Sequence, residues 1–132
     1  MESLRRILIV DDEEDWRRAL RITLQRAGFQ IDAASTAAEA WEFIRSNAYD
    51  LAILDISLTP GDSSNDDGMR LLRQLAEGGL LGPMRIVILS AHVRVEFMRE
   101  AVRLCGVADF LNKADLDPDL FVGQVQEILA GR

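Results

Sequence analysis

The apolar residues of this chain follow two different spacings. Three short, continuous apolar runs rich in β-branched residues occur at Ile7–Val10, Leu51–Leu54 and Ile86–Leu89. Runs of this length and composition predict strands buried on both faces, as in a parallel sheet. Two further runs, Phe29–Ala33 and Val107–Leu111, are interrupted by polar residues and predict the less buried strands at the sheet edges.

Between these runs, apolar residues recur at helical spacing, which predicts amphipathic helices. Ser35 or Thr36 is the expected N-cap of the second helix, and Asp117, followed by Pro118, that of the fifth. The first helix is expected to place one apolar stripe toward the core, made of Trp16, Leu20, Thr23, Leu24 and Ala27. The five predicted helices cover residues 14–27, 37–46, 69–76, 94–104 and 119–130. Five strands that alternate with five helices predict one α/β domain around a parallel sheet.

The composition supports one globular domain and limits the kinds of partner that the domain can bind. The chain has 132 residues, of which 48% are hydrophobic, so it can bury a real core. A net charge of −7 argues against binding of nucleic acid or an anionic membrane through bulk electrostatics. With Cys105 as the single cysteine, no internal disulfide can form. Residues 1–6 are polar and do not resemble a targeting segment, so we expect a cytoplasmic protein.

Acidic residues follow two of the predicted buried strands. Asp11 and Asp12 come directly after the first strand, and Asp55 comes directly after the third. In a doubly wound sheet of order 2-1-3-4-5 these strands are neighbours, about 4.8 Å apart, and flank the ligand crevice. Three carboxylates this close need a compensating cation. Mg²⁺ suits such a site because it prefers carboxylates together with water and phosphate oxygens.

Two more predicted strands end in groups that can bind a phosphoryl group. The fourth strand is followed by Ser90, and the fifth by Lys113. Lys113 is the only lysine among 15 basic residues. Either the single lysine stands there by chance, or the site needs a compact ammonium rather than a guanidinium.

Four segments of the chain together resemble the signatures of response-regulator receiver domains. They read ILIVDDEEDWR, YDLAILD, IVILSA and GVADFLNK, and they occur in the order and approximate spacing of that family. The resemblance covers residues 6–130 and leaves residues 1–5 as a short tail. It implies a single flavodoxin-like (βα)5 domain with a parallel sheet of order 2-1-3-4-5 and helices on both faces.

The resemblance also implies the site residues. Asp55 matches the phospho-acceptor, Asp12 the direct Mg²⁺ ligand and Asp11 its acidic neighbour, while Ser57 would offer its backbone carbonyl to the metal. Lys113 matches the family's lysine. Ser90 matches the switch hydroxyl, and Phe110 stands where the family often has a rotating aromatic residue.

Partners are implied in the same way. A sensor histidine kinase or a histidine phosphotransfer protein would donate the phosphoryl group, and an output domain or protein would respond. The domain would catalyse only its own phosphoryl transfer and dephosphorylation, and would bind neither nucleic acid nor membrane directly. The apolar fourth helix, with the fifth strand and fifth helix, offers a face for a partner or a dimer.

Three features depart from the family pattern. Ala114 follows Lys113 where the family usually has proline, so the loop there is expected to be remodelled. The loop from Asp55 to Gly68 is longer than the family's usual loop, and its polar stretch Thr59–Gly68 predicts a surface loop. His92 lies two residues after Ser90, at a position that tunes hydrolysis in this family.

Two other functions remain open from the sequence. LDISLT, residues 54–59, resembles the Asp-x-Asp-x-Thr signature of haloacid-dehalogenase-type phosphatases, but Ser57 replaces the second Asp, which is the general acid. The other alternative is a receiver that binds proteins without being phosphorylated.

Overall fold

A computed structural model describes residues 5–55, 67–79, 82, 84–90, 98–99, 101–103 and 106–130, and for residues 67–70 and 90 it describes the backbone only. The strands are β1 (Arg6–Val10), β2 (Gln30–Ala34), β3 (Leu51–Asp55), β4 (Arg85–Ser90) and β5 (Asp109–Asn112). The helices are α1 (Glu14–Arg26), α2 (Ala37–Ser46), α3 (Asp67–Glu77) and α5 (Pro118–Leu129), with a 3₁₀ turn η1 (Lys113–Asp115). Residues 98–99 and 101–103 are also helical, inside the predicted fourth helix.

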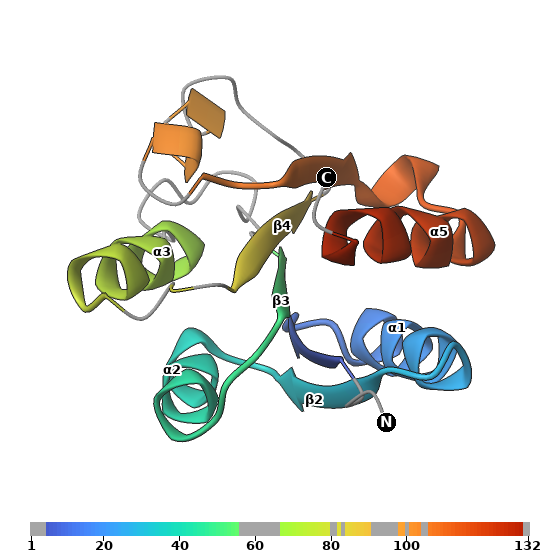
Figure 1. The fold of residues 1–132 in the computed structure, drawn as a ribbon, viewed down its shortest axis with the longest axis horizontal. Coiled ribbons are helices and arrows are strands. Elements are labelled where there is room, and N and C mark those ends of the chain that lie inside the picture. The colour runs from blue at the N-terminus through green and yellow to red at the C-terminus, as the bar shows by residue number, and fades with distance from the viewer. Residues whose placement is uncertain are drawn as a thin grey trace.

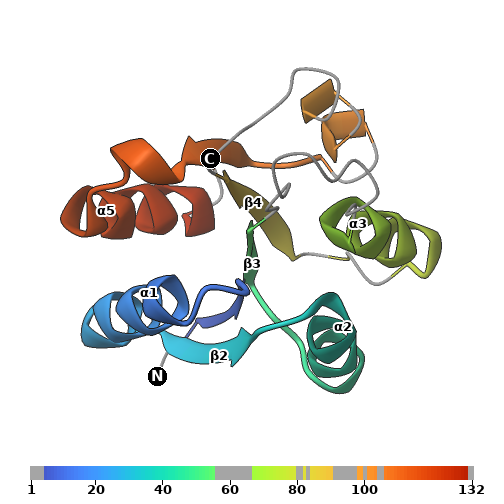
Figure 2. The same cartoon turned by 180° about the vertical axis from the view of Figure 1, so that it is seen from behind.

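The five strands form one parallel sheet of order β2-β1-β3-β4-β5, as predicted. Helices α1 and α5 cover one face of the sheet, and α2 and α3 cover the other (Figure 1). The same two layers are seen from behind in Figure 2. The order makes β1 and β3 neighbours at the point where the chain changes direction across the sheet, so their carboxyl ends lie side by side.

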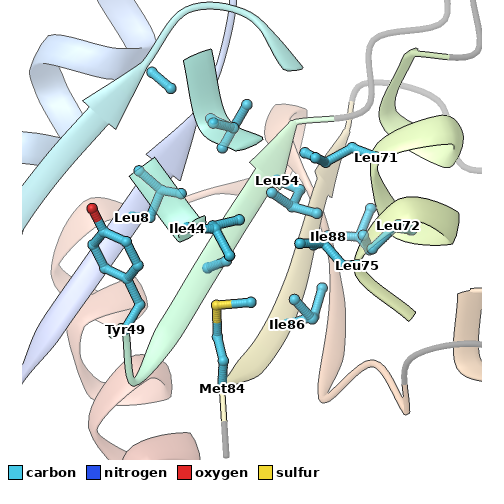
Figure 3. Packing of buried hydrophobic residues seen from close by; sticks show 14 of the residues in the cluster. Leu8, Ile44, Tyr49, Leu54, Leu71, Leu72, Leu75, Met84, Ile86 and Ile88 are labelled. Atoms are coloured by element: carbon cyan, nitrogen blue, oxygen red, sulfur yellow. The ribbon is translucent and has the colours of Figure 1, made fainter. Parts of the chain in front are cut away.

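Alternate residues of the central strands supply two separate cores. Ile7 and Ile9 of β1 join the core under α1 and α5, whereas Leu8 and Val10 join the core under α2 and α3. Figure 3 shows the second core, in which leucines of α3 pack against Ile86 and Ile88 of β4. Because both faces are covered, β1, β3 and β4 are apolar at nearly every position, which explains their continuous apolar runs.

Local sequence signals set most element boundaries. Thr36 caps α2 by accepting a hydrogen bond from the Glu39 amide, and Asp117 caps α5 through the Asp119 amide. Most predicted boundaries differ from the observed ones by one or two residues, and three of these differences matter here. Helix α3 begins at Asp67, so the last two residues of the expected loop Thr59–Gly68 are helical. Helix α1 ends at Arg26, which leaves Ala27 exposed as its C-cap, and β5 begins at Asp109 rather than at Val107.

Several predicted features lie outside the described residues: Ser57, His92, Cys105, residues 59–66 of the expected loop and the rest of the predicted fourth helix. Within the described part of the chain there is no cis peptide bond, and Lys113 and Ala114 begin the turn η1 directly after β5. Among those same residues, no helix is both long and apolar enough to cross a membrane.

Candidate functional site

Three aspartates meet at the carboxyl ends of β1 and β3. Asp11 and Asp12 follow β1, Asp55 ends β3, and one carboxylate oxygen from each lies within 4.8 Å of the other two. The Asp11 amide donates a hydrogen bond to the Ala34 carbonyl at 3.0 Å, which holds the end of β1 against β2. The Asp11 side chain, in turn, accepts a hydrogen bond from the Glu13 amide at 2.9 Å and is buried.

The side chain of Lys113 links two of these carboxylates. Its ammonium donates hydrogen bonds to Asp55 Oδ2 at 2.8 Å and to Asp11 Oδ1 at 3.3 Å. The Lys113 side chain is only 6% exposed and that of Asp55 only 2%, so the contact is shielded from water. Asn112 fixes the backbone here, because its side chain accepts a hydrogen bond from the Ala114 amide at the start of η1.

Burial and charge shift the pKa values of this pair. Burial raises the pKa of Asp55 to about 7; the hydrogen bond from Lys113 opposes the rise and the neighbouring Asp11 adds to it. Burial by itself lowers the pKa of Lys113, but the contacts with Asp55 and Asp11 outweigh it and the net shift is upward. Near neutral pH the lysine is therefore charged, whereas Asp55 is close to its midpoint in the absence of a metal.

The acidic cluster fits a divalent cation. Three carboxylates and one ammonium leave a formal charge of two negatives, which one divalent ion would balance. Two buried oxygens, Asp11 Oδ2 and Asp55 Oδ1, accept no hydrogen bond from the described residues. Asp11 Oδ2 does lie 3.0 Å from the Lys113 ammonium, but without hydrogen-bond geometry. Unpaired carboxylate oxygens are the ligands that Mg²⁺ prefers.

Two residues that the sequence did not mark as functional also lie against the ammonium. The ring centroid of Trp16 is 5.3 Å from Lys113 Nζ, and Glu13 Oε2 is 3.7 Å from it. The helical pattern marked Trp16 only as part of the buried stripe of α1. Its place one turn after the acidic pair was the available signal, because α1 begins directly behind the site.

The remaining predicted residues stand at neighbouring strand ends. Ser90 is the last residue of β4 and pairs in register with Asn112 of β5, one residue before Lys113. Its side chain lies outside the described structure. Phe110 is in β5, partly buried, and packs against the core under α2 and α3. The backbone of Ser90 therefore lies at the same edge of the sheet as the acidic cluster, and Phe110 lies further back along β5.

Comparison with known proteins agrees with this arrangement. The family model described as the response regulator receiver domain matches residues 7–125. The alginate biosynthesis transcriptional regulatory protein AlgB of Pseudomonas syringae pv. tomato is 34% identical over 113 residues, which are 85% of this chain and 23% of AlgB. The response regulator Rre1 of Synechocystis is 30% identical over 125 residues, or 94% of this chain and 51% of that protein. The chain spans about a quarter of the length of the AlgB relatives that it matches.

Solved structures give the same result. A two-component response regulator from Clostridium difficile superposes with a TM-score of 0.80 at 29% identity, covering 96% of this chain and 97% of that one. A CheY-like receiver domain protein from Methanospirillum hungatei gives a TM-score of 0.80 at 26% identity, covering 97% and 95% of the two chains. The fold, the acidic cluster and the family match lead to one conclusion: this chain belongs to the response regulator receiver domain family of two-component signalling.

Proposed function

We propose that Asp55 is the residue of this receiver domain that accepts a phosphoryl group. The observation that carries the proposal is the contact of the Lys113 ammonium with both Asp55 and Asp11, 2.8 and 3.3 Å away, inside a cluster of three aspartates. A buried carboxylate beside a fixed positive charge is a suitable nucleophile, because the charge stabilises its ionised form and stays in place as negative charge develops on the phosphoryl oxygens.

The transfer step balances as a displacement at phosphorus. An oxygen of ionised Asp55 attacks the phosphorus of a phosphohistidine on a donor protein. The P–O bond forms while the P–N bond breaks, and the imidazole leaves with its electron pair and takes up a proton. Lys113 then has a phosphoryl oxygen within reach as a new partner, because its ammonium already lies at the acceptor carboxylate.

The residues that would hold Mg²⁺ are Asp12, Asp55 and the Ser57 carbonyl, with Asp11 assisting directly or through water. When bound, the ion supplies charge neutralisation and orientation for the phosphoryl oxygens. Asp55 has two oxygens, so it can offer one to the metal and use the other as the nucleophile. Affinity is expected to be modest, because Mg²⁺ retains several waters.

We further propose that the phosphorylated state is read through Ser90 and Phe110. In this proposal the short hydroxyl of Ser90 reaches a phosphate on Asp55 through an inward movement of the loop that carries it. Movement of that loop would make room for the Phe110 ring to turn, which would change the surface near β5. Ser90→Ala is therefore expected to leave labelling of Asp55 largely intact and to uncouple it from partner affinity.

Partners and location follow from the proposed chemistry. The donor is a sensor histidine kinase or a histidine phosphotransfer protein, and the response passes to an output domain or protein. The receiver unit covers residues 6–130 and is cytoplasmic, and a dimer through the fourth helix, β5 and α5 is one form the output can take. Receiver domains are generally not classical enzymes, and this one would catalyse only its own phosphorylation and dephosphorylation.

The test is labelling by a small phosphodonor such as acetyl phosphate in the presence of Mg²⁺. The parent should take up one phosphoryl group, Asp55→Asn none, and the control Asp119→Asn, an exposed aspartate of α5, as much as the parent. Circular dichroism should show the same fold for all three. Label that persists in Asp55→Asn would refute the assignment.

The same assay separates the two alternatives. Rapid multiple turnover of donor would favour the phosphatase, and a parent that takes no label would favour a phosphorylation-independent module. The family match over residues 7–125 supports a receiver over the phosphatase.

A further inference from the structure

The ammonium of Lys113 lies between two kinds of partner. It donates hydrogen bonds to the carboxylates of Asp11 and Asp55, and it also lies 5.3 Å from the centroid of the Trp16 ring and 3.7 Å from Glu13 Oε2. A cation within about 6 Å of an aromatic centroid is attracted by the negative face of the ring, most strongly by an indole. The Trp16 contact is therefore an attractive interaction as well as a packing contact.

The Trp16 ring is held in this position by the core. Trp16 is half-buried in the first turn of α1 and packs against the core under α1 and α5. Leu20 and Leu24 of the same helix face are fully buried, which fixes the rotation of α1 about its axis. Packing therefore fixes the position of the indole. Glu13, in contrast, is on the surface, with 54% of its side chain exposed.

A metal at the acidic cluster would change how the ammonium is shared. Asp11 and Asp55 would then serve two cations, and the ion would repel the ammonium over the short distance between them. The Trp16 indole would not bind the metal, so its attraction for the ammonium would not weaken when the metal binds. The Lys113 side chain is only 6% exposed, and among the described residues its ammonium has no other charged or aromatic partner than these four side chains, of which only Glu13 is on the surface.

We propose that Trp16 is a positioning residue of the phosphorylation site, whose indole face holds the Lys113 ammonium beside Asp55 while Mg²⁺ occupies the carboxylates. The inference rests on the proposed function and adds a residue outside the acidic cluster to it. In this role Trp16 is not a ligand of the metal or of the phosphoryl group. It acts only through Lys113, by keeping a long side chain in the one place from which it reaches the acceptor.

The chain offers a matched control, because it has two tryptophans. Trp41 is in α2 and packs against the core on the opposite face of the sheet. In a Trp41→Phe protein, Trp16 is the only indole, and it can be replaced during expression by tryptophans carrying one, two or three ring fluorines. Fluorine withdraws charge from the ring face while leaving its size nearly unchanged, so a purely steric role would not respond.

The first measurement is the rate constant of labelling by acetyl phosphate at saturating Mg²⁺. Trp41→Phe should match the parent. In that background the rate should fall stepwise with each added fluorine, and Trp16→Leu should be slower by roughly three- to tenfold, the range that cation–π strengths imply. Trp16→Tyr should recover part of the loss. Urea unfolding of each protein tests whether the variants are folded at the assay temperature. If Trp16→Leu is not folded, the fluorinated series still decides whether the indole attracts the ammonium.

The second measurement needs neither metal nor phosphodonor. The fluorescence emission of Trp16 in the metal-free Trp41→Phe protein should shift when Lys113→Met removes the cation. The Trp41 emission of a Trp16→Phe protein should not shift on the same change. Emission of Trp16 that is insensitive to Lys113→Met, or labelling rates that are equal across the fluorine series, would overturn the positioning role. A parent that takes no label would instead overturn the proposed function and the role with it, while the emission experiment would still report whether the contact exists.

Discussion

At the scale of a single residue, two opposing effects act on the pKa of Asp55. Its side chain is 2% exposed and beside Asp11, and burial favours the neutral acid, yet a nucleophile must be ionised. Lys113 favours the ionised form but does not fully compensate, which is why the pKa of Asp55 stays near 7 without a metal. A divalent cation would complete the compensation, so in the proposed function the ionisation of Asp55 would depend on metal binding.

The first prediction is the pH dependence of stability in the metal-free protein. Because burial raises the pKa of Asp55 from 3.8 to about 7, its contribution to stability is largest in acid and is lost as pH rises toward and through 7. Asp55→Asn cannot ionise, so its free energy of unfolding should exceed that of the parent at pH 8 and converge with it toward pH 4. The difference at pH 8 should be about 2 kcal/mol, roughly half of what the pKa shift alone implies, because the amide also weakens the contact with Lys113. Urea unfolding in EDTA across this range measures the difference; parallel curves for the two proteins would contradict it.

The second prediction concerns the charge and the shape of Lys113. Lys113→Met leaves the carboxylates without their ammonium and should lower the free energy of unfolding of the metal-free protein at pH 8 by about 2–3 kcal/mol. Mg²⁺ should then stabilise this variant more than it stabilises the parent, since the ion replaces the missing charge. Thermal unfolding with and without Mg²⁺ gives both values.

Lys113→Arg is the matched variant, because it keeps the charge and changes only the shape. Both variants should bind Mg²⁺ and lose most of the switching response, and the methionine variant should lose phosphoryl transfer as well. The response can be followed as the change in amide hydrogen exchange of β5 on phosphorylation. An arginine variant that responds like the parent would mean that the lone lysine is an accident of composition.

At the scale of elements, the sequence predicts best where burial is complete. Strands β1, β3 and β4 are covered on both faces, so their apolar runs are continuous and their limits were found within a residue or two. The edge strand β5 carries a weaker pattern, and its start was placed two residues early. The pattern also placed Trp16 on the buried stripe of α1, but a stripe cannot distinguish a ring that faces only apolar neighbours from one that also faces a cation.

The third prediction tests the cap of α2. Thr36 accepts a hydrogen bond from the Glu39 amide, an otherwise unpaired donor of the first turn, at 3.1 Å. Thr36→Ala should lower the free energy of unfolding by about 1 kcal/mol. Ser35→Ala is the control, because Ser35 contributes its backbone amide, which donates to Glu39, and should change stability by less than half as much. Equal losses in the two variants would contradict the assignment of the cap.

The fourth prediction concerns a polar cluster at the other end of the sheet. The Tyr49 hydroxyl donates to Asp32 of β2 at 2.7 Å, and the Arg6 guanidinium of β1 donates to the same oxygen at 2.8 Å. Burial, followed by the contact with Asp32, raises the pKa of Tyr49, so its hydroxyl remains a donor at neutral pH. Tyr49→Phe should cost about 1 kcal/mol of unfolding free energy, measured in urea. A loss below a few tenths of a kcal/mol would show that Arg6 alone satisfies Asp32.

For the whole molecule, the strand ends allowed the meeting of three aspartates and one lysine to be predicted from the sequence. Asp11, Asp12, Asp55 and Lys113 were each placed after a strand, and a parallel sheet brings such ends to one edge. The sequence could not predict which side chains contact the Lys113 ammonium, because those contacts depend on side-chain positions that packing determines. Nor could it give the burial that raises the pKa of Asp55, which depends on every element around the site.

The fifth prediction is the effect of Mg²⁺ on the stability of the domain. An ion that binds only the folded protein should raise the free energy of unfolding by about 1.4 kcal/mol at ten times its dissociation constant. Asp12→Asn removes a charged oxygen from the exposed side of the cluster and should require a markedly higher Mg²⁺ concentration for the same gain. Urea midpoints over a Mg²⁺ titration measure both; a parent unaffected by the ion would argue against the site.

The hydrogen bond between Lys113 and Asp11 joins residues 102 positions apart in the chain. During synthesis, a polypeptide that has left the ribosome only as far as β4 already contains Asp55, the proposed acceptor, and the acidic pair Asp11 and Asp12, but not the ammonium of Lys113. Its carboxylates would repel one another, and the edge on which β5 belongs would be open. We expect such a nascent chain to be a poor phosphoryl acceptor. The chain would thus become able to accept a phosphoryl group only once β5 has been made. An unfinished or truncated chain would then not take phosphoryl groups from the donor protein.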